Sequence, residues 1–69
     1  MKKICGKIEV FFKNGDWRGY PNIDFGTIKK RKNLLMFSED KMLADNNPHQ
    51  YVVNLDSVNF VEEMPGLVK

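Results

Sequence analysis

Apolar and polar residues alternate along much of this chain. In the first twelve positions, four large apolar side chains occupy even-numbered positions, at Ile4, Ile8, Val10 and Phe12. A period of two is typical of a half-buried β-strand. We therefore predict a long first strand with one apolar face. Gly6 lies within it and marks a bend or a place where another backbone approaches closely.

The dipeptide Asn14-Gly15 follows this strand directly. Asn-Gly is the strongest short-range signal for a β-hairpin, because both residues tolerate the positive φ of a type I′ turn. We therefore predict a hairpin here, with Trp17 opposite Phe12. Further along the returning strand, Pro21 cannot donate a ladder hydrogen bond, so residues 19–22 are predicted to break it.

The middle of the chain predicts a second hairpin. Alternation resumes at residues 23–25, but Ile28 falls on the opposite phase, so Gly26 indicates a β-bulge between them. The apolar run at residues 34–37 is short and bounded by turn residues, which indicates a fairly buried strand. The basic run at residues 29–32 then lies at the tip of the hairpin.

Residues 50–63 predict a strand, a tight polar turn and a final strand. In the first of these strands one side is shared by Tyr51, Val53 and Leu55. In the second, Val58 and Phe60 are predicted to share one side, again at a spacing of two.

The segment between the second hairpin and this closing pair is the least regular. Ser38 is a candidate cap for a single helical turn at residues 39–44, and a short extended segment at residues 42–43 is the alternative. Pro65-Gly66 then ends regular structure. We predict one all-β domain at residues 1–64 and a flexible tail at residues 65–69. The domain is either a small five-stranded barrel or a rolled antiparallel meander.

Composition narrows the class of protein. Sixty-nine residues allow one domain with a marginal core. Cys5 is the only cysteine, so an internal disulfide is impossible and self-association becomes a plausible reinforcement. One free thiol fits a reducing compartment. No apolar run reaches the length of a signal peptide or a membrane span, so we expect a cytoplasmic protein without a membrane partner.

Eleven basic and nine acidic side chains give a net charge of +2, which neither demands nor excludes a polyanionic partner. The basic run is the strongest candidate for nucleic-acid binding, through phosphate contacts and base stacking. The residues concerned are the four cations Lys29, Lys30, Arg31 and Lys32, with Phe25 and Phe37 among the nearby aromatic rings. The alternative is a solvated turn whose charges protect a strand edge from aggregation.

A second candidate surface, for a protein partner, consists of Trp17, Arg18 and Tyr20. These residue types are enriched at interface hot spots because they combine large contact area with a polar group. The alternative is that Trp17 and Tyr20 cap the core of a very small domain.

Catalytic signals are weak. His49 is the only histidine, in a Pro-containing stretch, and a surface turn explains it. Cys5 is interpreted as a structural thiol, since no partner base is evident. Ser38 and Lys41 match a Ser-x-x-Lys motif without the larger domain that this motif needs. We therefore expect no catalytic residues, metal, cofactor or small-molecule substrate, and no enzyme.

Two segments resemble the Sm-like family of small RNA-binding barrels. Residues 11–19, followed by Asp24, resemble its first motif, and residues 52–61 resemble its second around the final turn. The resemblance implies a five-stranded SH3-like barrel that assembles into rings through edge strands. The family's base-binding Arg-Gly pair is replaced here by Asn54-Leu55, and its Met-Asn is absent, so the resemblance supports the fold more than RNA binding.

The sequence thus predicts a small non-enzymatic binding module. We expect it to bind another protein, or itself, as an accessory or regulatory protein of the kind that a phage or mobile element encodes. The alternative is a nucleic-acid-binding barrel that uses residues 29–32. A structural protomer of a ring or filament is the third reading.

Overall fold

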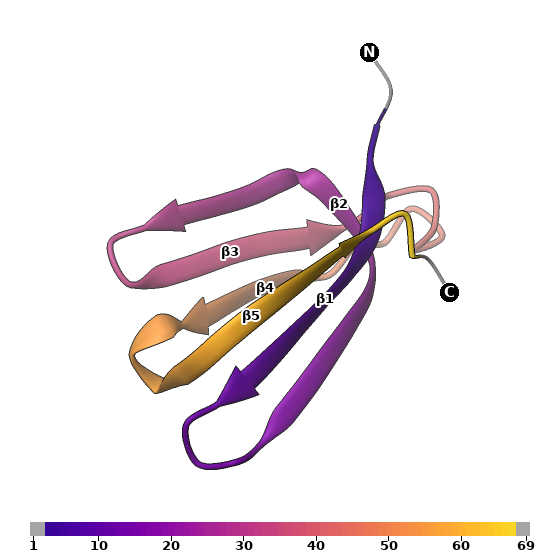
Figure 1. The fold of residues 1–69 in the computed structure, drawn as a ribbon. Helices are drawn as coiled ribbons and strands as arrows, with labels where there is room; N and C mark the ends of the chain where they lie inside the picture. Colours follow the sequence, from indigo (N-terminus) through magenta and orange to yellow (C-terminus); the bar gives the residue numbers. More distant parts are fainter. Residues whose placement is uncertain (1–2, 68–69) are drawn as a thin grey trace.

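Five antiparallel strands in one sheet make up the fold of a computed structural model, which describes residues 3–67 (Figure 1). The strands are β1 (Cys5–Phe12), β2 (Trp17–Arg31), β3 (Leu34–Glu39), β4 (Gln50–Asn54) and β5 (Val58–Pro65), with a 3-10 turn, η1 (Leu55–Ser57), before β5. The all-β prediction is confirmed. The order of the strands in the sheet is β4-β3-β2-β1-β5, and β4 does not pair with β5 among the described residues. The sheet is therefore not closed, and the SH3-like barrel stays a prediction.

The core lies on one side of this curled sheet. Its buried apolar side chains come from all five strands: Ile8, Val10, Ile23, Leu35, Phe37, Val53 and Val58. The apolar face predicted for the first strand is confirmed at Ile8 and Val10, with Phe12 packed beside them. Ile4 keeps the same parity but precedes β1 and is 57% exposed, so it does not contribute to the core.

The first hairpin is confirmed, but its turn is not type I′. The N–H of Phe12 donates to the carbonyl of Asp16 (2.8 Å), and the N–H of Gly15 donates to the carbonyl of Phe12 (3.0 Å). Gly15 has a φ of 94°, in the left-handed region. The Asn14 Oδ1 atom accepts the Asp16 N–H (2.9 Å), which fixes the loop at three residues instead of two.

The break predicted at residues 19–22 is wrong, because β2 continues through Pro21. The register of β1 against β2 shifts between Gly6 and Ile8, opposite this point. Asn22 takes a φ of 61° there. A bulge accommodates a proline because the extra residue need not donate to the ladder, so the strand bends and goes on.

Gly6 is a place of close backbone approach, as predicted. A Cβ at this position would overlap the carbonyl oxygen of Met64 and would lie 2.8 Å from the Cα of Pro65. Only glycine therefore fits where β1 meets the end of β5.

The end of the chain is bound to the sheet further than predicted. Pro65, assigned to the tail from the sequence, is the last residue of β5. The N–H of Gly66 donates to the carbonyl of Cys5 (2.7 Å). Residues 68–69 of the predicted tail lie outside the described residues, as do residues 1–2.

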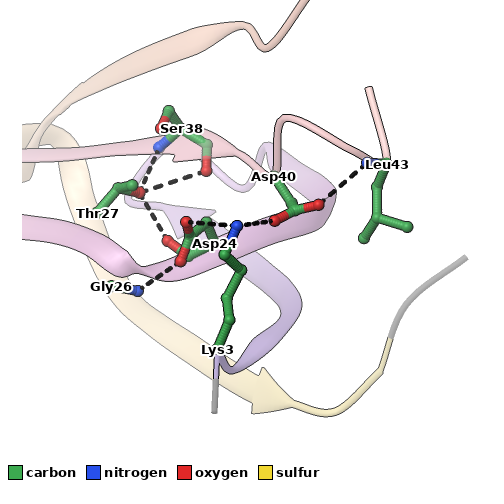
Figure 2. Close-up of polar contacts among 7 residues, drawn as sticks. All are labelled: Lys3, Asp24, Gly26, Thr27, Ser38, Asp40 and Leu43. Carbon is green, nitrogen blue, oxygen red and sulfur yellow. Dashed lines mark hydrogen bonds and ion pairs between the residues drawn. The ribbon is translucent and has the colours of Figure 1, made fainter. Parts of the chain in front are cut away.

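The bulge predicted at Gly26 is confirmed, and a side chain holds it together (Figure 2). The register of β2 against β3 shifts between Asp24 and Lys29. The Thr27 hydroxyl accepts the N–H of Ser38 (2.9 Å) and donates to the carbonyl of Asp24 (2.6 Å). The Gly26 N–H donates to the Asp24 carboxylate (2.9 Å). Side chains thus replace ladder bonds where β2 leaves the regular pairing.

A single turn follows β3 as predicted, closed by the Ala44 N–H donating to the carbonyl of Asp40 (3.0 Å), but the predicted Ser38 cap and the extended alternative at residues 42–43 are wrong. Ser38 belongs to β3, and residues 41–46 form hydrogen-bonded turns without a helix. Asp40 is the residue that caps them, because its carboxylate accepts the N–H of Leu43 (3.0 Å). Within residues 3–67 the single helical piece is η1.

Three turns meet at one end of the molecule, opposite the end that holds the termini (Figure 1). The N–H of Lys13, in the first hairpin, donates to the carbonyl of Ser57 (2.9 Å). The N–H of Leu55 donates to the carbonyl of Asn33, in the second hairpin (2.7 Å). Through these bonds η1 connects both hairpin loops.

Candidate interaction surfaces

Three aromatic side chains form a row across the outer face of the sheet. Phe11 lies opposite Trp17 of β2 and opposite Phe60 of β5. Directly opposite residues project from the same face, and Val10 beside Phe11 points into the core, so this row points away from the core. The predicted pairing of Trp17 with Phe12 is wrong, because the three-residue loop displaces it. We call Trp17, Phe11 and Phe60 the aromatic row.

The row combines stacking with exposure. The rings of Phe11 and Phe60 are stacked, with centroids 4.4 Å apart and planes inclined by 18°. Trp17 is 52% exposed and Phe60 is 53% exposed. The Lys7 Nζ atom lies 5.8 Å from the Trp17 ring centroid and 3.0 Å from the Glu9 carboxylate. The result is an apolar surface with an ion pair at its border.

Phe60 reaches this face because of a third register shift, between β1 and β5. Phe12 pairs with Val58 and Phe11 pairs with Phe60, so Asn59 is an extra residue in β5. The prediction that Val58 and Phe60 share one side is therefore wrong. A bulge changes the parity, which leaves Val58 in the core and turns Phe60 outward.

The three residues proposed from the sequence as a protein-binding surface do not lie on one face. Arg18 is exposed but lies opposite Val10, on the side of the sheet that carries the core. Tyr20 packs its ring against Phe37 (5.2 Å between centroids) and Tyr51 (4.7 Å). Trp17 alone of the three belongs to the aromatic row.

Sequence reasoning missed Phe11 and Phe60. The exposure of one phenylalanine of the pair Phe11-Phe12 was predictable from the sequence. Two consecutive residues of a strand project from opposite faces, so only one of the two rings can enter the core. Phe60 carried no such signal, since its orientation depends on the bulge.

All four cations of the basic run are exposed, and none of them forms an ion pair with another residue in the range 3–67. Lys32 is in the loop with a φ of 55°, and the other three are the last residues of β2. Lys29 lies opposite Met36, and Lys30 lies opposite the buried Leu35. The cations are therefore divided between the two faces, as alternation requires.

The two phenylalanines proposed as stacking platforms are not free beside these cations. Phe37 is 2% exposed and belongs to the core. Phe25 is partly buried and packs against the same core. A base cannot stack on Phe37 without unfolding of the sheet.

A polar cluster ties the N-terminal segment to the loop after β3 (Figure 2). The Lys3 Nζ atom lies 2.7 Å from the buried carboxylate of Asp40 and 3.8 Å from that of Asp24. The Lys3 hydrogen bond, with that from the Leu43 N–H, lowers the pKa of Asp40 below its ordinary value. The same Asp40 contact raises the pKa of Lys3. One cation thus lies between two carboxylates and joins the N-terminal segment to β2 and to the loop after β3.

Cys5 lies near the Asp40 carboxylate, and His49 lies beside that of Glu39. Burial, followed by the nearby Asp40 charge, raises the pKa of the Cys5 thiol, which disfavours the reactive thiolate. His49 is an exposed residue whose Nδ1 lies 2.9 Å from the Glu39 carboxylate, and its backbone N–H donates to the same oxygen. These His49 bonds lower the pKa of Glu39. Among residues 3–67 no three ligand side chains are grouped to hold a metal ion.

No protein-family model, curated protein or solved structure matches this chain. Within residues 3–67 no helix has the length and apolar character that a bilayer crossing requires.

Proposed function

We propose that this protein is a non-enzymatic interaction module that binds another protein through the aromatic row. The observation that carries the proposal is the exposure of Trp17 and Phe60 on the outer face of a sheet whose other face already supplies the core. The row lies outside the core and leaves two large aromatic side chains, Trp17 and Phe60, about half exposed. Its residue types are those that dominate protein interfaces.

The border of the row fits this role. Lys7 and Glu9 form an ion pair beside the rings, so a partner meets an apolar centre and a charged rim. The free thiol of Cys5 fits a reducing compartment, which supports a cytoplasmic accessory or regulatory protein. The occupant we expect is a heterologous protein that presents an apolar patch to the row.

Affinity capture from extracts of the expressing cells tests the proposal. The variant Trp17→Ser with Phe60→Ser removes the exposed rings, and Met42→Ser with Leu43→Ser removes two exposed apolar side chains from the loop after β3. We expect a partner that wild type and the loop variant retain and the row variant loses, once circular dichroism shows that all three are folded. Equal retention by all three contradicts the proposal.

A nucleic-acid-binding function is the second candidate, and one observation favours it. The cations of the basic run are exposed and lack ion-pair partners among the described residues, as phosphate binding requires. The burial of Phe37 removes one of its stacking rings. A salt titration of oligonucleotide binding decides the matter, since a phosphate-driven affinity falls steeply with salt and disappears when the four cations become alanine.

A further inference from the structure

A second outward surface combines cations with aliphatic side chains. Lys29 of β2 lies opposite Met36 of β3, and Met36 lies opposite Val52 of β4. Arg31 lies opposite Leu34 in the next outward row. Leu35 and Val53 are buried, and side chains alternate between the two faces along each strand. The five residues just named therefore project from the outer face of the sheet. We call Lys29, Arg31, Leu34, Met36 and Val52 the basic-aliphatic face.

The apolar part of this face is open to solvent. Val52 is 63% exposed and Leu34 is 37% exposed. Beside them lies a hollow of about 380 Å³ whose lining includes Lys29, Met36 and Val52, together with Thr27 of the bulge. The departure of β2 from β3 at residues 24–29 creates this hollow, because the strands lose their regular spacing there.

The five residues of this face carry charge of one sign, and the Asp24 carboxylate at its border accepts the Gly26 N–H and lies 3.8 Å from the Lys3 Nζ atom. The outward residues of β3 and β4 are apolar or uncharged, and the two β2 cations above them form no ion pair within residues 3–67. Lys29 and Arg31 are two residues apart on one strand, hence about 7 Å apart along it. Neighbouring carboxylates of one peptide segment span a similar distance and complement both cations.

The aliphatic side chains of this face favour an acidic peptide over a single-stranded nucleic acid as the polyanion that it binds. Single-stranded nucleic acid needs aromatic or guanidinium planes for stacking, and this face offers aliphatic surface and one arginine. Two aromatic residues, Phe37 and Tyr51, also line the hollow, but they pack against each other and against the core. Leucine or phenylalanine side chains of a peptide can instead cover Leu34 and Val52. We propose that the basic-aliphatic face binds an acidic peptide segment in which carboxylates alternate with large apolar side chains. This surface is distinct from the aromatic row.

Fluorescence anisotropy with labelled synthetic peptides tests the proposal. The probe is a dodecapeptide of glutamate, leucine and phenylalanine, and two matched controls replace its glutamates with glutamine or its apolar residues with serine. We expect saturable binding of the probe that weakens as salt is raised. Each control peptide is expected to bind at least about tenfold more weakly, because it lacks either the charge-assisted bonds or the apolar contact.

Charge reversal locates the site. Lys29→Glu with Arg31→Glu is expected to weaken binding by about tenfold or more, whereas Lys13→Glu with Lys41→Glu makes the same change in net charge elsewhere and leaves affinity unchanged. Val52→Ser is expected to weaken binding without altering its salt dependence. Trp17→Ser leaves peptide affinity intact, so failure of the aromatic-row proposal and failure of this one are distinguishable.

Three results overturn the proposal. The first is an absence of probe binding at low salt. The second is equal loss of affinity in the two charge-reversal variants, which reduces the effect to net charge. The third is displacement of the probe by oligouridylate or by anionic vesicles at lower concentration than by unlabelled peptide, which assigns the face to a nucleic acid or to a lipid surface.

Discussion

Replacement of Gly6 by alanine is the sharpest test of how the last strand packs. The new Cβ overlaps the Met64 carbonyl oxygen and lies 2.8 Å from the Cα of Pro65, both of which are backbone atoms that cannot rotate away. The end of β5 must therefore move. Overpacking of this kind costs about 1–3 kcal/mol. The reduced freedom of the unfolded chain returns about 0.4–1 kcal/mol. We expect a net loss of about 1–2 kcal/mol in the free energy of unfolding.

Urea denaturation followed by circular dichroism measures this loss. In a thermal melt, the Tm of the Gly6→Ala protein is expected to fall by about 5–15 °C for a domain of this size. Gly26→Ala is the matched control, because its Cβ meets only the Asp24 carboxylate, at 3.2 Å, in an exposed bulge. We expect the control to change the free energy of unfolding by less than about 0.5 kcal/mol. A Gly6→Ala protein as stable as wild type refutes the close crossing of β1 and β5.

Three further predictions concern stability. A double-mutant cycle on Phe11→Ala and Phe60→Ala should give a coupling energy of about 0.5–1.5 kcal/mol for the stacked pair, and a coupling near zero means that the rings do not meet in solution. Thr27→Val should cost about 1–3 kcal/mol in a urea titration, because a backbone N–H of β3 loses its acceptor; an unchanged midpoint excludes that role. The pKa of Asp40 is lowered in the folded state, so its stabilising contribution is present above its ordinary value of 3.8 and is lost as pH falls through the lowered pKa. Asp40→Asn should therefore flatten the acid limb of the stability profile, and an acid limb identical to wild type shows that Lys3 does not hold this carboxylate.

Where the strands pair regularly, the sequence predicts both which segments form strands and which of their side chains enter the core. Ile8 and Val10 are buried as a period of two predicts. The same rule failed at Phe60, because the extra residue Asn59 reverses the parity after Val58. A bulge depends on the partner strand, so local alternation does not reveal it unless a glycine marks it.

Loop geometry was less accessible for a related reason. Asn14-Gly15 correctly predicted a hairpin, but the predicted two-residue loop is wrong, because the loop has three residues and the Asn14 side chain accepts the Asp16 N–H within it. Ser38 is a good helix cap by residue type, yet it belongs to β3, where it pairs with Asp24 of β2 and Gln50 of β4. Tertiary hydrogen bonds overrode local preference in that case.

For the candidate surfaces, too, residue types could be read from the sequence, whereas neighbours on other strands could not. Trp17 was identified from its residue type, but its neighbours in the aromatic row come from β1 and β5, and their identity follows from register. The division of the basic run between two faces was predictable from alternation alone. The aliphatic partners of Lys29 and Arg31 were not, since they belong to β3 and β4.

Site-specific photo-crosslinking in the expressing cells tests the central claim, protein binding through the aromatic row, most directly. A photoreactive phenylalanine analogue at Phe60 is placed within the row, and the same analogue at Met42, which is 79% exposed, serves as the control. We predict a discrete protein adduct at position 60 that is absent at position 42 and disappears with Trp17→Ser. No adduct at position 60, or the same adducts at both positions, contradicts the claim.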